Sequence, residues 1–375
     1  MKITAITTER LRLPLDPPFP AAWDPVPREA VAATLVRVHT DEGLTGVASG
    51  DTMDGFEPFA HLFVGEDPLR LARHARTLET MSFHAGRFWP VEAALWDLAG
   101  QALGVPVARL LGGPGDRVPA YASCGVLLGP AERAEAALAL REHGFRALKL
   151  RIARERIEEG IAVVAAVREA VGDTMDVLVD LNQGWRMAGD IAPALAPSAA
   201  RRVVERLGEL GVRWVEEPLP GHELAGLRTL REQTGMAIAG GEMARSFDDL
   251  LRALEAEALD VLQPDVVLAL GISRARTLAE LALHRNRAFT PHTWTNGIGL
   301  LANLHVVCGV GGGPYLEFPL DPPAWTVERR DFMLAEPVRT DRGGCLRVPD
   351  LPGLGVVLDE EAIAHHRVAR TGAPA

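Results

Sequence analysis

From about residue 118 onward, short apolar runs rich in β-branched residues alternate with amphipathic helical stretches. This alternation favours β/α units and a parallel sheet. Helices are expected between the runs, for example over Ala131–Glu142 and Ser273–His284. Eight such strands in roughly 200 residues is the number that closes a (β/α)8 barrel. The strand candidates are Ala120–Val126, Ala147–Ile152, Asp176–Asp180, Trp214–Glu217, Ala237–Glu242, Val261–Val267, Phe289–Trp294 and Tyr315–Phe318.

An open doubly wound α/β sheet is the main alternative fold. The Gly-rich phosphate-binding loop that such a sheet carries after its first strand is missing from this sequence. The run Gly311–Gly313 precedes a predicted strand, so it indicates a turn instead. A modified (β/α)8 barrel of the TIM type is therefore the preferred prediction.

The first 117 residues predict a separate α+β unit. Alternating residues from Ile3 and the later run Val31–Val38 indicate strands, and the prolines of Pro14–Pro27 argue against a helix or a central strand between them. Helices are predicted over Pro68–Thr80 and Pro90–Leu103. The expected organisation is a capping domain over residues 1–117, a barrel over 118–335, and a tail over 336–375 that packs back on the cap.

Composition and charge exclude several classes of partner. The formal net charge of −11 argues against nucleic acid and anionic membranes. The amino terminus lacks the apolar core of a signal peptide, and no uninterrupted apolar run is long enough to span a bilayer. The three cysteines, Cys124, Cys308 and Cys345, are too widely spaced for a disulfide framework or a paired zinc motif. A cytoplasmic protein is the expectation.

Polar residues fall at the carboxyl ends of the predicted strands. In barrels of this kind the chemistry gathers at that end. Random surface charge would not favour the same end of each strand. The residues concerned are Lys149, Arg151, Asp180, Asn182, Glu216, Glu217, Glu242, Asp265, His292 and Glu317.

Three of these carboxylates are predicted metal ligands. Asp180, Glu216 and Glu242 close three adjacent strands and should converge at the barrel mouth. Three hard oxygen ligands suit Mg²⁺, whereas zinc would require histidine or cysteine in the trio. The alternative is that each carboxylate caps a helix or pairs with a lysine or arginine.

Two cations and one histidine complete a predicted acid–base set. Lys149 and Arg151 are two residues apart on one strand, so both point into the barrel mouth. They can hold a substrate carboxylate, and Lys149 can neutralise an enolate oxygen, although an ion pair with the acidic trio is an alternative role. His292 is the expected base, with Asp265 orienting its imidazole ring.

Several short motifs resemble the enolase superfamily, and within it the mandelate racemase subgroup, over nearly the whole chain. Each motif is weak alone, but their order and spacing make the resemblance specific. They are Lys149–Arg151, Val179–Trp185, Trp214–Pro218, Ala239–Glu242, Gln263–Asp265, Thr290–His292 and Leu316–Phe318.

This resemblance implies a cap over a modified barrel, one Mg²⁺ held by the acidic trio, and an Asp265–His292 base dyad. It also implies that Glu317 hydrogen-bonds the substrate carboxylate or the intermediate, and Asn182 and Trp294 are expected to contact substrate. The segments Pro17–Pro27 and Asp51–Phe56 match cap loops that select the substrate. Many relatives are homo-oligomers.

One departure from the family pattern bears on the reaction. The usual Lys-x-Lys of the second strand is Lys149-Leu-Arg151 here, and a guanidinium is a poor proton acceptor. A single good base favours elimination of water from an acid sugar to give a 2-keto-3-deoxy acid. A racemase or epimerase, a lactone cycloisomerase, and a non-catalytic binding protein are the alternatives.

The sequence leaves the substrate open. A diacid sugar needs a second cation near its distal carboxylate, and no residue can be assigned to that position. Arg12, Arg28 and His84 have no evident role. Aldonic acids and diacid sugars are therefore equally compatible with the sequence, and small apolar acids less so.

Overall fold

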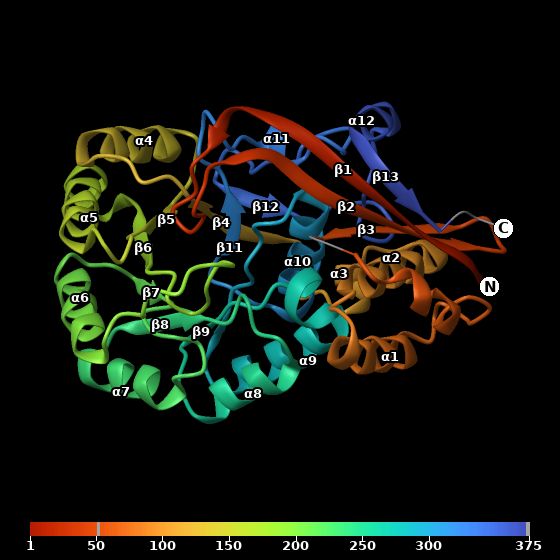
Figure 1. Cartoon of the computed structure of the whole chain (residues 1–375), viewed down its shortest axis with the longest axis horizontal. Coiled ribbons are helices and arrows are strands. Elements are labelled where there is room, and N and C mark those ends of the chain that lie inside the picture. Colours follow the sequence, from red (N-terminus) through yellow and green to blue (C-terminus); the bar gives the residue numbers. More distant parts are fainter. Residues whose placement is uncertain (51–52, 373–375) are drawn as a thin grey trace.

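The structure is a computed structural model, and it describes residues 1–50 and 53–372. Figure 1 shows two parts side by side. A curled parallel sheet ringed by helices lies on the left, and an antiparallel sheet with its own helices lies on the right. In the described part of the chain, no helix is both long enough and apolar enough to cross a membrane.

The parallel sheet is the barrel. Among the described residues its strand order is β10-β9-β8-β7-β6-β5-β4-β11. Strand β4, the first of these strands in the chain, thus pairs with β11, the last, which an open doubly wound sheet does not do. The sheet therefore confirms the predicted barrel-type α/β class. Its strands are β4 (Arg117–Ser123), β5 (Ala147–Arg151), β6 (Asp176–Asp180), β7 (Trp214–Glu216), β8 (Ala237–Gly240), β9 (Val261–Leu262), β10 (Ala288–Phe289) and β11 (Leu316–Pro319).

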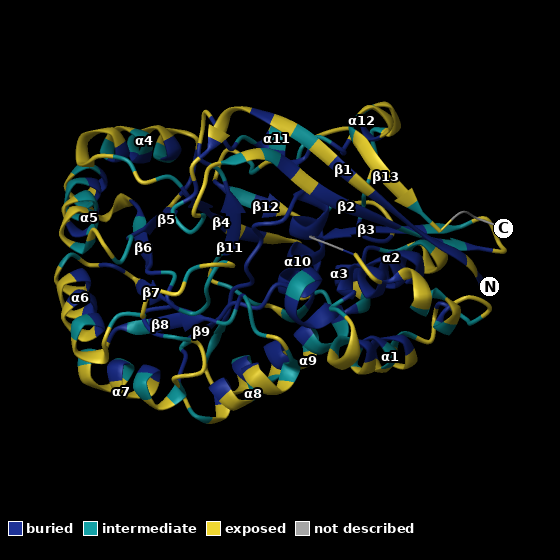
Figure 2. Cartoon of the chain, viewed as in Figure 1, coloured by how far each residue is buried: buried dark blue, intermediate teal, exposed yellow. Residues whose placement is uncertain are grey.

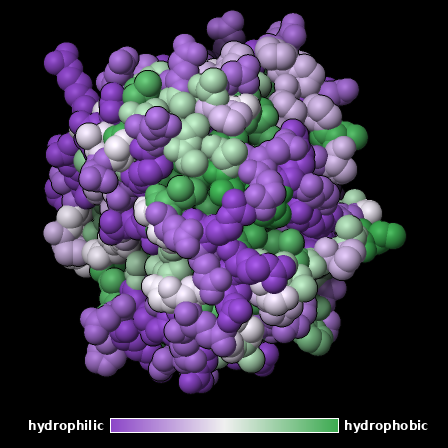
Figure 3. Space-filling view, turned by 90° about the vertical axis from the view of Figure 1, so that its left-hand side faces the viewer, coloured by the Kyte–Doolittle hydropathy of each residue, from purple (hydrophilic) through white to green (hydrophobic). Residues whose placement is uncertain are grey.

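Helices surround this sheet with their apolar faces inward. In α6, for example, Val203, Val204 and Leu207 are buried, whereas its outward residues are exposed. Figure 2 shows the same pattern along the outer ring, and the face in Figure 3 is mostly hydrophilic, with hydrophobic groups toward its middle. The helices are α4 (Pro130–Glu142), α5 (Ile157–Val171), η2 (Gly172–Thr174), α6 (Pro197–Glu209), α7 (Leu224–Thr234), α8 (Phe247–Glu255), α9 (Gly271–His284) and α10 (Gly297–Val310).

The cap is an antiparallel sheet of order β13-β1-β2-β3, with helices packed below it. Helix α2 is buried along most of its length because it contacts β2 and β3 on one side and the barrel helix α9 on the other. The N-terminal elements are β1 (Ile3–Phe19), β2 (Arg28–Thr40), β3 (Thr45–Gly50), η1 (Glu57–Leu62), α1 (Leu71–His84), α2 (Trp89–Leu103) and α3 (Val107–Leu110).

The C-terminal elements contact both parts. Strand β13 pairs with β1 of the cap, whereas β12 pairs with β4 of the barrel. Asp97 in α2 accepts a hydrogen bond from the backbone N–H of Leu354 at 2.7 Å. The division of the chain after residues 117 and 335 stays a prediction. These elements are α11 (Val327–Arg330), β12 (Cys345–Arg347), α12 (Glu360–His366) and β13 (Arg367–Thr371).

The first half of the Pro-rich segment is an edge strand, which is consistent with the prediction that it is neither a helix nor a central strand. Strand β1 continues to Phe19, through Pro14, Pro17 and Pro18. Its pairing with β13 stops at Leu11, and its register with β2 breaks between Pro14 and Phe19. Proline has no N–H to donate, but it is tolerated where a strand forms an irregular edge. The prediction that this segment is not helical is confirmed.

Several predicted strands are too long at the carboxyl end, and two of them overrun by five residues. The strand predicted over Val261–Val267 stops at Leu262, and a π-helix, η3 (Val266–Leu270), follows with Asp265 as its N-cap. The strand predicted over Phe289–Trp294 stops at Phe289. Pro264 and Pro291 follow closely after these strand ends, and each lacks the N–H that a ladder needs. The chain there turns into the barrel mouth.

Candidate active site

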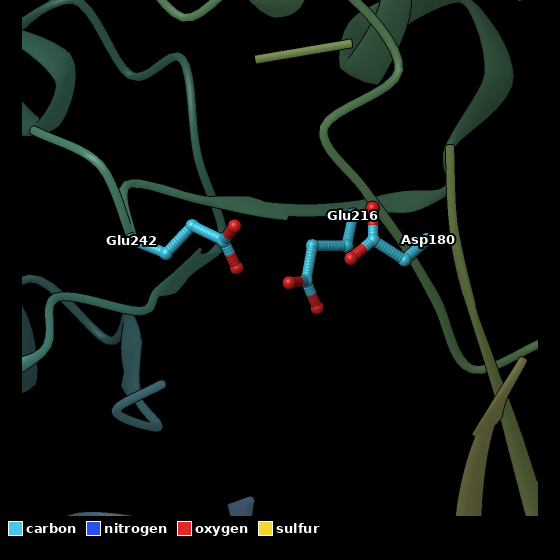
Figure 4. Close-up of side chains that lie close together, drawn as sticks. All are labelled: Asp180, Glu216 and Glu242. Carbon is cyan, nitrogen blue, oxygen red and sulfur yellow. The ribbon is translucent and has the colours of Figure 1, made fainter. Parts of the chain in front are cut away.

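The predicted acidic trio is brought together. Asp180 ends β6, Glu216 ends β7, and Glu242 lies two residues beyond β8. One carboxylate oxygen from each lies within 4.8 Å of the others, and all three residues are buried. Figure 4 shows the Glu242 carboxylate pointing toward the other two. Parallel strand ends place these residues side by side, because neighbouring strands in register end at the same rim.

Each member of the trio is held by neighbouring groups. Glu216 accepts hydrogen bonds from Lys149 Nζ at 2.8 and 2.9 Å and from Gln263 Nε2 at 2.8 Å. Asp180 pairs with the guanidinium of Arg151. Glu242 Oε1 accepts from the indole N–H of Trp185 at 2.6 Å, but its Oε2 is buried without a hydrogen bond. The predicted ion pairs are therefore present, and one oxygen of the trio remains unsatisfied.

The charge balance of the site favours a divalent cation. Positive charge comes from Lys149, Arg151 and a protonated His292. Burial raises the pKa of the neighbouring Glu217 well above its ordinary value, so this carboxyl is neutral. An excess of two negative charges remains if the other five buried carboxylates of the site are ionised. Buried charge without compensation is costly. Burial also raises the pKa of Glu242, although His292 opposes this rise. The buried carboxylates counted are Asp180, Glu216, Glu242, Asp265 and Glu317. The residues present thus fit a metal ion bound by hard oxygen ligands.

The histidine and aspartate form the expected pair. His292 Nδ1 lies 3.1 Å from Asp265 Oδ2. The other oxygen of Asp265 accepts from Asn303 Nδ2 at 3.0 Å and from the Val267 N–H at 3.0 Å, which fixes the carboxylate. Because Asp265 accepts the Nδ1 proton, Nε2 is the nitrogen directed at the mouth, 3.5 Å from Glu242 Oε2.

The protonation of His292 follows from its surroundings. Burial alone would lower its pKa, but the carboxylates of Glu242, Glu317 and Asp265 raise the pKa to about 10. The imidazole is therefore protonated while the trio holds no cation. A cation bound by the trio would oppose the negative charge of these carboxylates and lower the pKa of His292 toward the neutral form that a base needs.

Glu317 lies between the two cations of β5. Its Oε1 is 2.8 Å from Lys149 Nζ and accepts from Ser123 Oγ at 2.7 Å and from the indole N–H of Trp294 at 3.1 Å. Burial would raise the pKa of Glu317, but Lys149, His292 and Arg151 hold it well below its usual range. An ionised carboxylate only accepts hydrogen bonds, so in this state Glu317 suits a substrate hydroxyl rather than a second carboxylate.

A cavity of about 200 Å³ opens onto His292 and onto Glu242 of the trio. It is lined by Asn182, Trp294 and Arg151, three of the four residues predicted to contact substrate, and Lys149 is not part of its lining. Of the predicted specificity loops, Asp51 and Thr52 lie outside the described residues, while Met53 and Phe56 are buried in the hydrophobic core. The lining is Trp23, Arg28, Arg151, Asn182, Trp185, Met187, Glu242, Met243, Leu268, His292 and Trp294.

Several supporting residues were not predicted from the sequence. Ser123 bonds Glu317, Gln263 bonds Glu216, and Asn303 bonds Asp265. Asn303 offered a usable signal, because it and His305 are buried polar residues in the otherwise apolar helix α10. Ser123 and Gln263 offered a weaker one, since each is a polar residue within a predicted strand.

Known proteins match the chain along most of its length. The family model for the mandelate racemase/muconate lactonizing enzyme N-terminal domain matches residues 3–112, and the enolase C-terminal domain-like model matches residues 131–362. The D-galactarolactone cycloisomerase of Agrobacterium fabrum is 29% identical, with 98% of this chain and 99% of that protein covered. The D-galactonate dehydratase of Ralstonia nicotianae is 30% identical, with 97% and 94% covered.

A solved structure of a racemase from Streptomyces coelicolor A3(2), with bound magnesium, has a TM-score of 0.83. It is 27% identical, and the match covers 98% of this chain and 100% of that one. These three proteins carry three different reaction names, so similarity alone does not select the reaction. Together, the family models and the shared fold show that the chain belongs to the mandelate racemase/muconate lactonizing enzyme family of the enolase superfamily.

Proposed function

We propose that this enzyme is a Mg²⁺-dependent acid-sugar dehydratase that converts a hydroxylated carboxylic acid into a 2-keto-3-deoxy acid. Asp180, Glu216 and Glu242 would hold one Mg²⁺ per chain. When bound, the ion supplies Lewis-acid stabilisation of the negative charge that develops on the substrate carboxylate. Self-association into a homo-oligomer is part of the proposal, and light scattering on the purified protein tests it.

The observation that carries the proposal is the unequal chemistry of the two groups that could act as bases. His292 is buried and oriented by Asp265, so it can accept a proton. Arg151 pairs with Asp180, and its guanidinium stays protonated under all ordinary conditions. A racemase needs competent bases on both faces of the carbon. One competent base supports chemistry on one face, as elimination requires.

The residues define a sequence of steps. His292 removes the proton from C2, and the C–H electron pair becomes part of an enediolate. Lys149 Nζ, which lies 2.8 Å from Glu317, places positive charge where the enediolate oxygens carry negative charge. The C3–O bond then breaks, and the leaving hydroxyl takes the proton from the imidazolium of His292 and departs as water. The enol that remains tautomerises to the 2-keto acid.

The similarity to a lactone cycloisomerase keeps that reaction as a second candidate. It would use the same base and the same enediolate, with a carboxylate as the leaving group instead of hydroxide. The distinction between the two therefore lies in the substrate rather than in the residues at the strand ends.

The test is incubation of the purified protein with Mg²⁺ and a library of aldonic acids, diacid sugars and their lactones. We expect 2-keto acid from at least one acid sugar, abolished by EDTA and reduced by about 10²- to 10⁴-fold in His292→Asn. The matched control is His222→Gln, which changes an exposed histidine on the surface. Keto acid formed from a lactone, but from none of the open-chain acids, would support the cycloisomerase. Solvent deuterium exchange at C2 of both enantiomers would support the racemase and overturn the proposal.

A further inference from the structure

The cavity wall opposite the trio comes from the cap. Trp23, in the connection between β1 and β2, and Arg28, the first residue of β2, line this wall, and neither has a part in the steps proposed above. Of the three residues that the sequence left without a role, Arg12 and His84 are exposed outside this cavity, and Arg28 lines it. The cavity thus contains a second guanidinium in addition to Arg151.

The two guanidinium groups both lie against one indole ring. Arg151 Cζ lies 4.8 Å and Arg28 Cζ lies 5.7 Å from the centre of the Trp23 ring, so at most 10.5 Å separates the two Cζ atoms. A charge-assisted hydrogen bond spans about 3 Å between nitrogen and oxygen. Arg28 is therefore close enough to the barrel mouth to contact a small ligand that also reaches Arg151.

Asp24 orients the guanidinium of Arg28 but bonds only part of it. Its Nε and Nη2 pair with Asp24, whose side chain is 6% exposed. Within the described residues, Nη1 of Arg28 has no hydrogen-bond partner, and its side chain is 35% exposed. A buried acid that fixes one side of a guanidinium leaves the other side preorganised for a ligand oxygen.

The rest of the distal wall offers little to a polyol tail. Met187, Met243 and Leu268 are apolar. The indole N–H groups of Trp185 and Trp294 already donate to Glu242, Ser123 and Glu317. A chain that ended in free hydroxyl groups would lose hydrogen bonds to water there without recovering them. A terminal carboxylate would meet Arg28.

We propose that Arg28 binds the distal carboxylate of the substrate, so that the enzyme acts on a diacid sugar rather than on an aldonic acid. This inference rests on the proposed function for the reaction, but it makes a separate claim about recognition. Arg28 sets specificity, and the groups at the strand ends carry out the chemistry.

The test measures binding by calorimetry on the Mg²⁺-loaded protein, with unreactive ligands matched in size. Succinate, glutarate and adipate are each compared with the monoamide of the same acid, which lacks the second charge. We expect the dicarboxylate to bind about 10- to 100-fold more tightly than its monoamide in the wild type. We expect Arg28→Met to remove this preference, and Arg28→Lys to keep part of it.

The control variant is Arg12→Met, which removes an exposed guanidinium on β1 and should leave the preference unchanged. If Arg28→Met does not fold, Arg28→Gln tests the same charge with a side chain that can still bond Asp24. The proposal is wrong if the wild type shows no preference for dicarboxylates, or if the preference survives both substitutions at Arg28.

The assay also separates this inference from the proposed reaction. Keto acid formed from aldonic acids with no dicarboxylate preference would overturn the inference and leave the dehydratase intact. A preference that depends on Arg28, without keto acid from any diacid sugar, would support the inference and overturn the dehydratase.

Discussion

The barrel mouth and the β1–β2 connection of the cap face each other across one cavity, yet they are built differently. At the mouth, Lys149 and Glu216 are fully buried, and each has more than one partner among the side chains around it. In the cap, Trp23 and Arg28 are partly exposed and depend on ring contacts and one ion pair. The chemistry is thus rigidly preorganised, while recognition rests on a segment that can change without disturbing it.

The largest expected effect is at the mouth. Glu242→Gln replaces a carboxylate whose Oε2 is unsatisfied with a neutral amide, so it should weaken Mg²⁺ binding. We expect kcat to fall by at least about a thousandfold, because charge stabilisation at the developing enediolate is lost. Titration of the metal by calorimetry, alongside the keto acid assay, measures both effects.

Glu232→Gln provides the matched control. It makes the same chemical change on the exposed surface of α7, where Glu232 only pairs with Arg228. If Glu242→Gln kept its metal binding and activity, the trio would have no part in the mechanism. The proposed difference between a catalytic mouth and a substrate-binding cap would then be wrong.

A smaller effect is expected from the cap. Trp23→Leu removes the ring that lies between Arg28 and Arg151, but Arg151 keeps its contacts with Asp180 and Ser123. We expect KM to rise about tenfold, with kcat changed by less than about threefold, because binding is lost and chemistry is not. Steady-state kinetics separate the two parameters. An equal fall in kcat would show that the cap takes part in the chemical step.

An effect on stability, rather than on catalysis or substrate binding, is expected where the two parts meet. His305 in α10 accepts from the N–H of Ala108 in α3 and contacts the carbonyl of Leu354. Burial lowers the pKa of His305 to about 4, so the folded state keeps the ring neutral. Protonation favours the unfolded chain, and stability is lost as pH falls from about 6.5 to about 4. The full effect is roughly 3 kcal/mol.

The measurement is urea unfolding of the wild type and His305→Gln between pH 7 and pH 4. As pH falls, the free energy of unfolding should decrease more steeply in the wild type than in His305→Gln. This difference in slope is expected even if the substitution lowers stability at pH 7. His222→Gln should follow the wild type. Parallel pH profiles for the wild type and His305→Gln would show that this junction does not couple the cap to the barrel.

Much of the mouth could be predicted, because parallel strands in a barrel end at one rim. Asp180, Glu216 and Glu242 were placed by that rule alone, and the structure brings them together. The supporting bonds of Ser123 and Asn303 could not be predicted, since they join segments far apart in the chain. Arg28 could not be assigned for a related reason, because its place depends on how an irregular Pro-rich strand end lies over the barrel.

Strand β13 has a consequence for the order in which the protein can be assembled. It covers an edge of β1, but the barrel separates these two strands in the chain. During synthesis, β1 to β3 therefore leave the ribosome long before β13 does, and the β1 edge stays open while the barrel is being made. An uncovered strand edge is a template for pairing with other chains. The nascent chain should be most prone to aggregate in that interval, and the last strand to emerge closes the edge.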